Sequence, residues 1–440
     1  MSVALDAPKD AFRLSQLIYD TRYRSYTIQV VVLLVFVAFL AWLLNNTAAN
    51  LAAKDKDIDF SFLWARAGYD IDQQLIPYTN DSTHFRALLI GLLNTMAVAI
   101  LACISATILG VTVGILRLSK NWLVARLMTV YVEVFRNVPL LLWIVLCFAL
   151  FSELPKEPKD FKVTQEMVDS WAGPEEGRIY PAASMIFMDT VAVTNRGTNV
   201  PKPLLHRPLG VIDVGGIPIN LSTIAVLAVF GASLWVNRRI RAQAKVVQEA
   251  TGIRPVTWWK SLAVIFLPTI VMLVVLGLHF EVPAFPANEA GVSKGFNFQG
   301  GINVAHSFTA LLIALTVYSA TYIAEGVRAG ILAISKGQTE AAYALGLRPG
   351  RTMSLIILPQ ALRVIIPPLI SQYLNITKNT TLGMAISYLD LKGTLGGITL
   401  NQTGRELECM LLMMLIYLCI SLMISAVMNV YNNSVKLKER

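Results

Sequence analysis

The chain has 440 residues, of which 55% are apolar and 15% are charged, with a mean hydropathy of +0.58 and a net charge of +9. Roughly a quarter of the residues of a soluble globular protein are charged, so this composition excludes an ordinary soluble domain and indicates a membrane protein. The four cysteines lie in apolar stretches without metal-type spacing, which argues against a zinc site or a disulfide framework. They are Cys103, Cys147, Cys409 and Cys419.

Eight windows are long and apolar enough to cross a bilayer, which takes about 20 residues. The first is interpreted as an uncleaved anchor that follows Arg22 and Arg24, with a signal peptide as the alternative. The seventh contains Pro367 and Pro368, from which we expect a kink. In chain order the windows are roughly 28–44, 87–116, 127–151, 217–236, 261–280, 309–332, 361–377 and 409–430.

Lysine and arginine concentrate in alternate segments between these windows. They cluster in the two terminal segments and in 117–126, 237–260 and 333–360. Because cytoplasmic loops of membrane proteins carry an excess of Lys and Arg, this asymmetry predicts that these segments and both termini are cytoplasmic. It also accounts for much of the net charge, which therefore does not point to a nucleic acid.

The basic segment 335–359 contains the signals of two short helices. Ser335 and Gln338 form a capping-box pattern at its start. Gly346 is a typical helix stop, and Pro349 is typical of the first turn of a following helix. The pattern predicts two short cytoplasmic helices joined by a tight bend, which suits docking into a groove of another protein. The alternative is an amphipathic loop on the membrane surface.

The same segment carries Glu-Ala-Ala, three residues, Gly, nine residues and then Ile-x-Leu-Pro. This spacing resembles the EAA signature of the inner-membrane permeases of bacterial binding-protein-dependent ABC importers. The resemblance implies that the segment couples the membrane subunit to a separate ATPase. The matching residues are Glu340, Ala341, Ala342, Gly346, Ile356, Leu358 and Pro359.

Flanking motifs resemble the polar amino acid permease subfamily over about 85–151 and 309–430. Two extra spans and an outer loop separate these two parts, and another span precedes them. This layout is similar to the long permease subunits of general L-amino acid transporters. The motifs are Gly91–Thr95, Tyr131–Leu140, Glu325–Ile331, Leu358–Pro368 and Lys378–Leu382.

The expected fold is all-α, a polytopic membrane protein with about eight transmembrane helices built on an ABC importer type I permease core. Residues 1–84 are expected to hold a cytoplasmic N-terminus, an extra anchor helix and an outer loop, and 85–151 the first part of the core. An insertion, 152–308, is expected to hold an outer loop and two extra transmembrane helices. The second part of the core, 309–440, contains the coupling loop 335–359.

Two Glu-x-x-Arg pairs lie at the cytoplasmic ends of predicted spans, Glu133 with Arg136 and Glu325 with Arg328. Residues three apart on a helix face each other, so each pair is expected to neutralise itself near the membrane. Two roles remain open, a structural ion pair at the interface and an inner gate that rearranges during transport.

Lys378, Thr380 and Thr381 are expected at the outer end of the seventh span. The family resemblance favours a place for them in the substrate path. The alternative is that Lys378 extends to the membrane interface for its own solvation.

The chain lacks Gly-x-x-x-x-Gly-Lys-Ser/Thr and any hydrolase or metalloprotease motif. The resemblance therefore implies that it is a transport subunit and not an enzyme, with ATP and Mg²⁺ bound by a partner ATPase and no cofactor or metal on this chain. It further implies a periplasmic amino-acid-binding protein, a second permease chain, a polar L-amino acid as substrate and a location in the bacterial inner membrane. The alternatives are a secondary transporter driven by an ion gradient, expected to show isolated intramembrane acids and an internal repeat, and an enzyme or scaffold active in 152–216.

Overall fold

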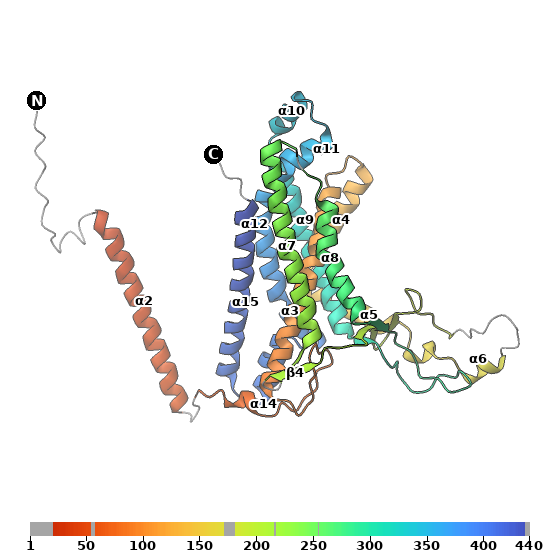
Figure 1. Ribbon diagram of the computed structural model, residues 1–440. Helices are drawn as coiled ribbons and strands as arrows, with labels where there is room; N and C mark the ends of the chain where they lie inside the picture. Colours follow the sequence, from red (N-terminus) through yellow and green to blue (C-terminus); the bar gives the residue numbers. More distant parts are fainter. Residues whose placement is uncertain (1–20, 54–57, 171–180, 215–216, 254, 436–440) are drawn as a thin grey trace, which may run out of the picture. The chain divides into compact units, whose positions relative to one another are not determined.

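The computed structural model describes residues 21–53, 58–170, 181–214, 217–253 and 255–435. Internal contacts divide the chain between Ser61 and Phe62 into two units. In the first unit, α2 (Thr21–Ala52) is a single apolar helix (Figure 1), and most side chains of 24–50 are exposed. Its stretch Arg24–Asn50 is long enough to span a membrane, as expected for the first window.

The second unit is built from long helices joined by short elements. The described part of the chain contains seven helices that are long and apolar enough to span a membrane, or eight if a bent pair counts as one span. This confirms the expected polytopic helical fold. The long helices of the second unit are α3 (His84–Leu116), α4 (Trp122–Asn137), α5 (Leu140–Glu153), α7 (Leu221–Thr251), α8 (Trp258–Val275), α9 (His306–Leu332), α12 (Leu358–Asn379) and α15 (Glu406–Val435).

The window 127–151 is not one helix. Helices α4 and α5 meet at an angle of 103°. Val138 lies between them in an extended conformation, with φ −102° and ψ 133°. Pro139 causes the break, since proline has no N–H to donate and disfavours helical geometry at the residue before it. By contrast, α12 runs from Leu358 to Asn379 through both of its internal prolines.

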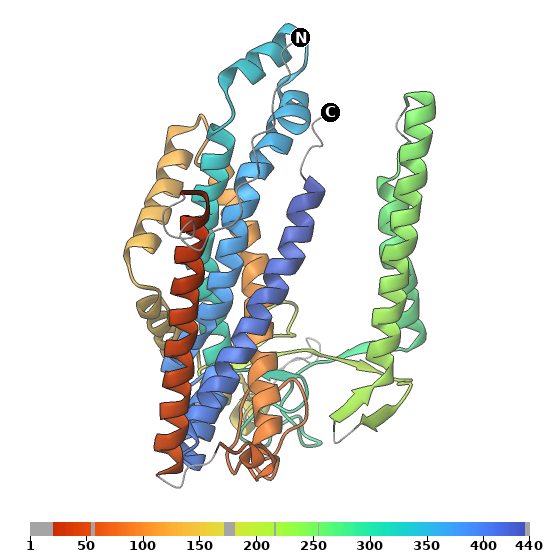
Figure 2. The ribbon, with the colours of Figure 1, turned by 90° about the vertical axis from the view of Figure 1, so that its left-hand side faces the viewer.

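Helix α7 extends well beyond its predicted apolar window of 217–236. It continues to Thr251 and ends at Gly252, which adopts φ +71°. The segment 237–251 is rich in Arg, Lys, Gln, Glu and Ala, which are good helix formers, so the helix outlasts its apolar part. Helices α7 and α8 pack against each other, and Figure 2 shows this pair standing apart from the other spanning helices.

Helix α9 lies at the centre of the remaining helices and packs against α3, α4, α5 and α12. The contact with α3 is close because it is formed at glycines. A Cβ on Gly110 would lie 2.7 Å from the Ile323 side chain, and one on Gly114 would lie 2.7 Å from the Ala324 carbonyl oxygen. Small residues let helix backbones approach each other in a membrane, where packing replaces the hydrophobic effect as the driving force.

Three small antiparallel sheets lie at the end of the helices opposite α10 (Lys336–Ala344) (Figure 1). Two of these sheets join strands that precede α7 to strands that follow α8, and all three are an addition to the expected all-α architecture. Pairs such as Lys202 with Glu281 join residues far apart in the chain. The strands are β1 (Ala192–Thr194), β2 (Gly197–Val200) and β7 (Ile302–Val304), β3 (Lys202–Leu205) with β6 (Leu278–Glu281), and β4 (Val211–Val214) with β5 (Ile217–Asn220).

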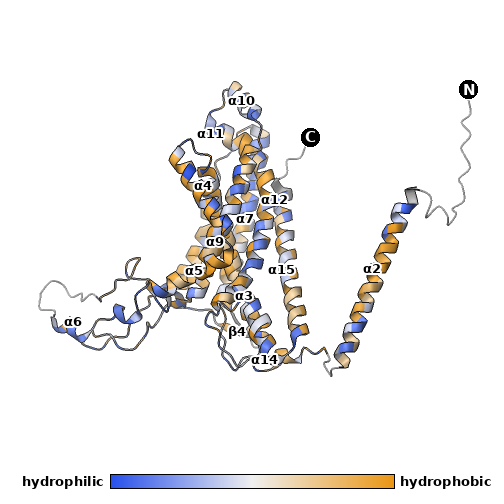
Figure 3. Ribbon diagram, turned by 180° about the vertical axis from the view of Figure 1, so that it is seen from behind, coloured by the Kyte–Doolittle hydropathy of each residue, from blue (hydrophilic) through white to orange (hydrophobic). Residues whose placement is uncertain are grey.

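We call the end of the second unit where the three sheets lie the strand end, and the end where α10 lies the α10 end. Hydrophobic residues dominate the long helices, whereas α6 is mostly hydrophilic (Figure 3). The short helices are α6 (Gln165–Ser170), α10 (Lys336–Ala344), α11 (Pro349–Thr352), α13 (Leu391–Gly393) and α14 (Leu400–Thr403). Single 3₁₀ turns lie at Ser61–Trp64, Pro158–Phe161 and Thr380–Ile386, and π-helical turns at Met353–Ile357 and Thr394–Thr399.

Candidate functional site

Helix α10 ends in a hydrogen-bonded cap at Gly346. The Leu347 N–H donates to the Ala342 carbonyl at 3.1 Å, and the Gly346 N–H donates to the Tyr343 carbonyl at 2.9 Å. Gly346 has φ +74°, a conformation that costs an L-residue about 1–2 kcal/mol. Pro349 then opens α11. The predicted helix stop and restart are both confirmed.

The expected capping box at the start of α10 is not formed. Ser335 precedes the first turn, but its side chain makes no capping hydrogen bond. The amide oxygen of Gln338 instead faces α12, where the Gln360 side-chain nitrogen lies 3.5 Å away. The prediction was wrong because a tertiary partner draws the Gln338 side chain away from the helix terminus.

The second of the two expected short helices is the beginning of a spanning helix. From Pro349 to Ile386 the chain forms one helical segment of 38 residues, passing through the π-helical turn at Met353–Ile357. Pro359 lacks the N–H for an ordinary helical hydrogen bond, which accounts for the irregular turn before it. Ile356 and Leu358 therefore lie where this π-helical turn passes directly into α12.

The surface of α10 combines exposed polar and apolar groups. Glu340 and Ala341 are exposed, whereas Ala342 is buried against the rest of the chain. The side chains of Tyr343 and Leu345 are 50% and 81% exposed, although this helix lies outside the membrane-spanning stretches. Large apolar side chains left uncovered outside a membrane mark an interaction surface.

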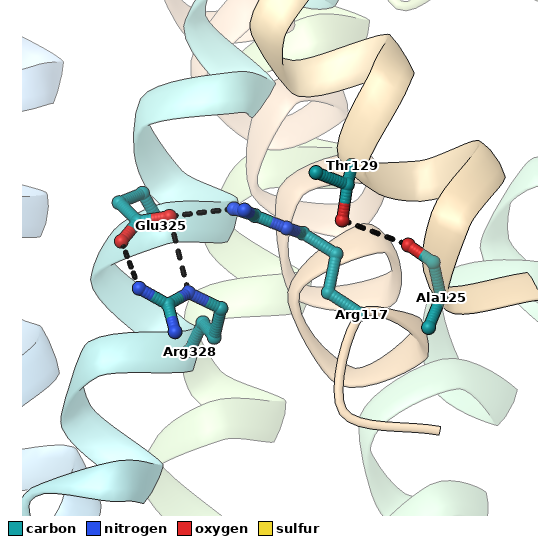
Figure 4. Close-up of polar contacts among 5 residues, drawn as sticks. All are labelled: Arg117, Ala125, Thr129, Glu325 and Arg328. Atoms are coloured by element: carbon teal, nitrogen blue, oxygen red, sulfur yellow. Dashed lines mark hydrogen bonds and ion pairs between the residues drawn. The ribbon is translucent and has the colours of Figure 1, made fainter. Parts of the chain in front are cut away.

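A three-residue charge cluster lies near the α10 end of the bundle (Figure 4). Glu325 on α9 pairs with Arg328, one helical turn away, at 2.6 Å, and with Arg117 from the end of α3 at 2.5 Å. The expected pairing of Glu325 with Arg328 is therefore confirmed. Figure 4 also shows Thr129 donating to the Ala125 carbonyl on the neighbouring helix α4.

Arg117 was missing from the sequence prediction. Its side chain is only 9% exposed, against 30% for Glu325 and 33% for Arg328. The sequence does contain a signal for this role, since Arg117 directly follows the apolar window 87–116. It therefore lies at the same end of the bundle as Glu325, which is near the end of the window 309–332. Two guanidinium groups on one carboxylate link α3 and α9 at this end.

The second predicted pair, Glu133 with Arg136, is not found among the described residues. Glu133 is exposed, while the guanidinium carbon of Arg136 lies 5.2 Å from the centre of the Tyr322 ring. This cation–π contact to α9 replaces the expected ion pair. It turns Arg136 towards a small cavity of about 100 Å³ that Glu325 and Gln372 also line. The structure thus brings Arg136 and Glu325 together and leaves Glu133 outside.

Two of the three residues predicted at the end of α12, Thr380 and Thr381, form hydrogen bonds to backbone carbonyls within the same turn of helix. The Thr380 hydroxyl donates to the Thr377 carbonyl at 2.9 Å, and the Thr381 hydroxyl donates to the Lys378 carbonyl at 2.8 Å. The Lys378 side chain is exposed. A place for Lys378, Thr380 and Thr381 in the substrate path stays a prediction.

The motif Gly91–Thr95 holds the segment that follows α12 against α3. The Thr95 hydroxyl accepts a hydrogen bond from the Leu391 N–H at 3.0 Å, and the Asn94 side chain donates to the Leu389 carbonyl at 3.0 Å. A Cβ on Gly91 would lie 2.8 Å from the Asp390 carbonyl oxygen. The motif therefore has a structural role in this chain.

Asp390 is a buried carboxylic acid that the sequence analysis did not identify. It accepts hydrogen bonds from the Gly393 N–H at 2.8 Å and the Tyr417 hydroxyl at 3.4 Å. Burial raises the pKa of Asp390 from its ordinary 3.8 to about 6, against the opposing effect of these donors and of Lys392. Within the segment between the last two spans it caps the short helix α13.

Asp390→Asn is expected to remove a pH dependence of stability. Because folding raises its pKa, the Asp390 carboxyl keeps its proton up to about pH 6 in the folded chain but loses it near pH 3.8 in the unfolded chain. The stability of the wild type therefore falls as the pH rises from 3.8 to 6 and is constant above pH 6. A shift of this size corresponds to about 2–3 kcal/mol. Thermal unfolding of the detergent-purified protein at pH 4 and at pH 7.5 should show that the stability of the variant relative to the wild type is higher at pH 7.5. An equal difference at both pH values would contradict the assignment.

Comparison with known proteins places this arrangement in a family. Residues 253–437 match the family model described as binding-protein-dependent transport system inner membrane component. Over its whole length the chain is 64% identical to the whole glutamate/glutamine/aspartate/asparagine transport system permease protein BztB of Rhodobacter capsulatus. It is 40% identical to the general L-amino acid transport system permease protein AapQ of Rhizobium johnstonii, over 96% of this chain and 94% of that one. It is 37% identical to the putative amino-acid ABC transporter permease protein YhdX of Escherichia coli, over 95% of both. The chain therefore belongs to the binding-protein-dependent transport system inner membrane components, among the long amino-acid ABC transporter permeases.

Proposed function

We propose that this permease forms the path of an ATP-driven importer for polar L-amino acids and receives mechanical work from a separate ATPase through residues 335–359. One observation carries the proposal: only residues 345–348, which form the hydrogen-bonded cap at Gly346, separate α10 from the helical segment that begins at Pro349 and continues as the spanning helix α12. The short link and its two hydrogen bonds favour transmission of a displacement of α10 to α12. Such a connection suits alternating access, in which two states of the bundle differ in stability.

The α10 end is proposed to face the cytoplasm. Arg348 and Arg351 lie there beside α10, and Arg238, Arg239 and Arg241 lie in the long extension of α7. The positive-inside rule supports this orientation, with the strand end outside a bacterial inner membrane. The Lys and Arg residues of the two terminal segments of the sequence separately support a cytoplasmic place for both termini.

The proposed partners follow from the same assignment. ATPase subunits with ATP and Mg²⁺ would bind at the α10 end, a periplasmic binding protein at the strand end, and a second, different permease chain beside the spans. The whole-length similarity to a relative named for glutamate, glutamine, aspartate and asparagine supports acidic and amide amino acids as the substrate class.

Transport by the reconstituted complex tests the proposal. In proteoliposomes with the ATPase and binding protein, L-glutamate, L-glutamine, L-aspartate and L-asparagine should each stimulate ATP hydrolysis and accumulate only when ATP is present. Accumulation driven by a proton or sodium gradient without ATP would contradict the proposal and support a secondary transporter. L-lysine is the matched control substrate, because it shares the backbone groups and lacks an acidic or amide side chain.

Arg328→Gln is expected to change the ratio of ATP hydrolysed to amino acid transported while leaving assembly intact. Glu325 keeps its partner Arg117 in this variant, so the carboxylate is not left unpaired. Arg328 itself is partly exposed, which limits the loss of stability. The ratio should rise about tenfold at most, equivalent to about 1.4 kcal/mol of coupling. Arg126→Gln on α4, at the same end of the bundle, is the control, and an unchanged ratio in Arg328→Gln would argue for a purely structural ion pair.

A further inference from the structure

A polar cavity of about 530 Å³ lies at the strand end, where five separate segments meet. Its volume falls within the range of about 300–1,000 Å³ typical of small-molecule sites. The lining comes from the loop before α3, the end of α5, the turn between β1 and β2, the start of α9 and the segment after α12. Its polar members are Asp72, Ser152, Asn195, Arg196, Asn303, His306, Ser307 and Ser387.

A second cavity of about 310 Å³ adjoins the first and shares Arg196 and Asn303 with it. Arg196 lies in the turn between β1 and β2, and Asn303 lies on β7 of the same sheet. The Asn303 side chain donates to the Asn199 side chain at 3.0 Å, which fixes its amide group. The insertion therefore contributes a rigid edge to the cavity, and Arg196 stands on that edge.

Buried polar atoms of two side chains in the lining lack a hydrogen bond of good geometry within the described chain. His306 is 7% exposed, and neither of its ring nitrogens forms a hydrogen bond of good geometry within the described chain, although the carbonyls of Thr194 and Asn195 lie near the ring. The buried side-chain oxygen of Asn195 has no hydrogen-bond donor in the same part of the chain. Because buried polar groups in proteins are almost always paired, atoms left open in a polar cavity indicate a polar occupant.

The charges of the lining match a free amino acid. Among the described residues that line the larger cavity, Arg196 is the one Lys or Arg and Asp72 the one Asp or Glu. A free amino acid carries an α-carboxylate and an α-ammonium group. The planar fork of an Arg guanidinium pairs with a carboxylate through two hydrogen bonds, and a carboxylate accepts from an ammonium group. The neutral amides and hydroxyls remain for a polar substrate side chain.

We propose that this cavity receives the free amino acid before it enters the spans, with Arg196 binding the α-carboxylate and Asp72 the α-ammonium group. This inference rests on the proposed function, because the cavity lies at the end away from α10. It assigns the insertion a part in substrate binding, since β1, β2 and β7 carry Arg196, Asn195 and Asn303 or hold them in place. It also explains recognition of several amino acids by one site, because the two charged contacts read only the groups that all amino acids share.

Equilibrium binding of radiolabelled L-glutamine to the assembled complex without its binding protein tests the site. Wild type should bind L-glutamine saturably and discriminate at least about tenfold, equivalent to about 1.4 kcal/mol, against both L-glutamine α-amide and N-acetyl-L-glutamine. Arg196→Gln should weaken L-glutamine binding about tenfold and abolish discrimination against the α-amide, which lacks the carboxylate, while retaining discrimination against the N-acetyl compound. Asp72→Asn should show the reverse pattern.

The controls are Arg207→Gln, an exposed residue that follows β3, and Asp70→Asn, an exposed residue of the same loop as Asp72, and both lie outside the two cavity linings. Both should bind as the wild type does. The inference is overturned if the wild type shows no saturable binding of L-glutamine. It is also overturned if Arg196→Gln, Asp72→Asn and their controls discriminate equally against the α-amide and the N-acetyl compound. ATP-driven uptake of L-glutamine by the wild type is measured in parallel. If that uptake persists while the binding pattern fails, the site is refuted and the proposed function stands.

Discussion

Replacing Gly346 by alanine is expected to lower ATP-driven amino acid uptake about five- to thirtyfold, because about 1–2 kcal/mol of backbone strain falls on the cap that ends α10. Gly346 has φ +74°, and a Cβ there would meet no atom within 4 Å. The effect is therefore one of backbone conformation and not of steric conflict. If the backbone of the alanine variant relaxes to relieve this strain, the hydrogen bonds donated by the N–H groups of residues 346 and 347 would break. The angle at which α10 leaves the bundle would then change.

Gly350→Ala is the matched control for this prediction. Gly350 is four residues away, also has open space around its Cα and lies in α11 without a positive φ. Alanine at this position favours the helix and should leave uptake unchanged. Uptake is measured in proteoliposomes at equal amounts of assembled complex. Equal uptake by the two variants would show that the conformation of Gly346 has no part in coupling.

Glu325→Gln is expected to destabilise the folded protein by about 3 kcal/mol, because removing one partner of a buried ion pair leaves the other charge uncompensated. The group left behind is Arg117, whose side chain is 9% exposed and whose buried Nε already lacks a hydrogen-bond acceptor among the described residues. Partial exposure of Glu325 places the loss at the lower end of the range for wholly buried pairs. Thermal unfolding in detergent measures the effect.

A double variant separates the lost pair from general damage at this site. Arg117→Gln combined with Glu325→Gln removes both the buried cation and its partner, so part of the stability lost in Glu325→Gln should return. Residues in contact give coupling energies of about 0.5–3 kcal/mol in such cycles. Strictly additive losses would refute the direct interaction between α3 and α9 at this position.

Local signals in the sequence predicted the helix stop and restart within 335–359 and most of the spans. Gly346 and Pro349 determine the backbone by their own chemistry, so the helix stop and restart could be predicted without knowledge of the neighbours. The break before Pro139 was equally local, since Asn137-Val-Pro139 carries the signal within three residues. The apolar character of the window outweighed that signal in the prediction of a single span.

Features that depend on contacts between distant segments were not predictable in the same way. The pairing of Lys202 with Glu281 joins short strands across two spanning helices, and strands of three or four residues have too few positions to show an alternating pattern. Arg117 and Asp390 likewise acquire their roles from partners on other helices. Gln338 shows the converse, because its partner Gln360 overrides the local capping pattern.

Photo-crosslinking from the tip of α10 tests most directly whether another polypeptide binds there. A p-benzoylphenylalanine at Leu345, whose side chain is 81% exposed, should crosslink to the ATPase subunit in membranes that contain the whole complex. The same probe at Leu154, which is 74% exposed at the strand end, is the matched control and should give no ATPase adduct. An ATPase adduct at Leu345 alone is the predicted result. No adduct at Leu345, or an ATPase adduct at Leu154, would contradict the account of this loop as the coupling element.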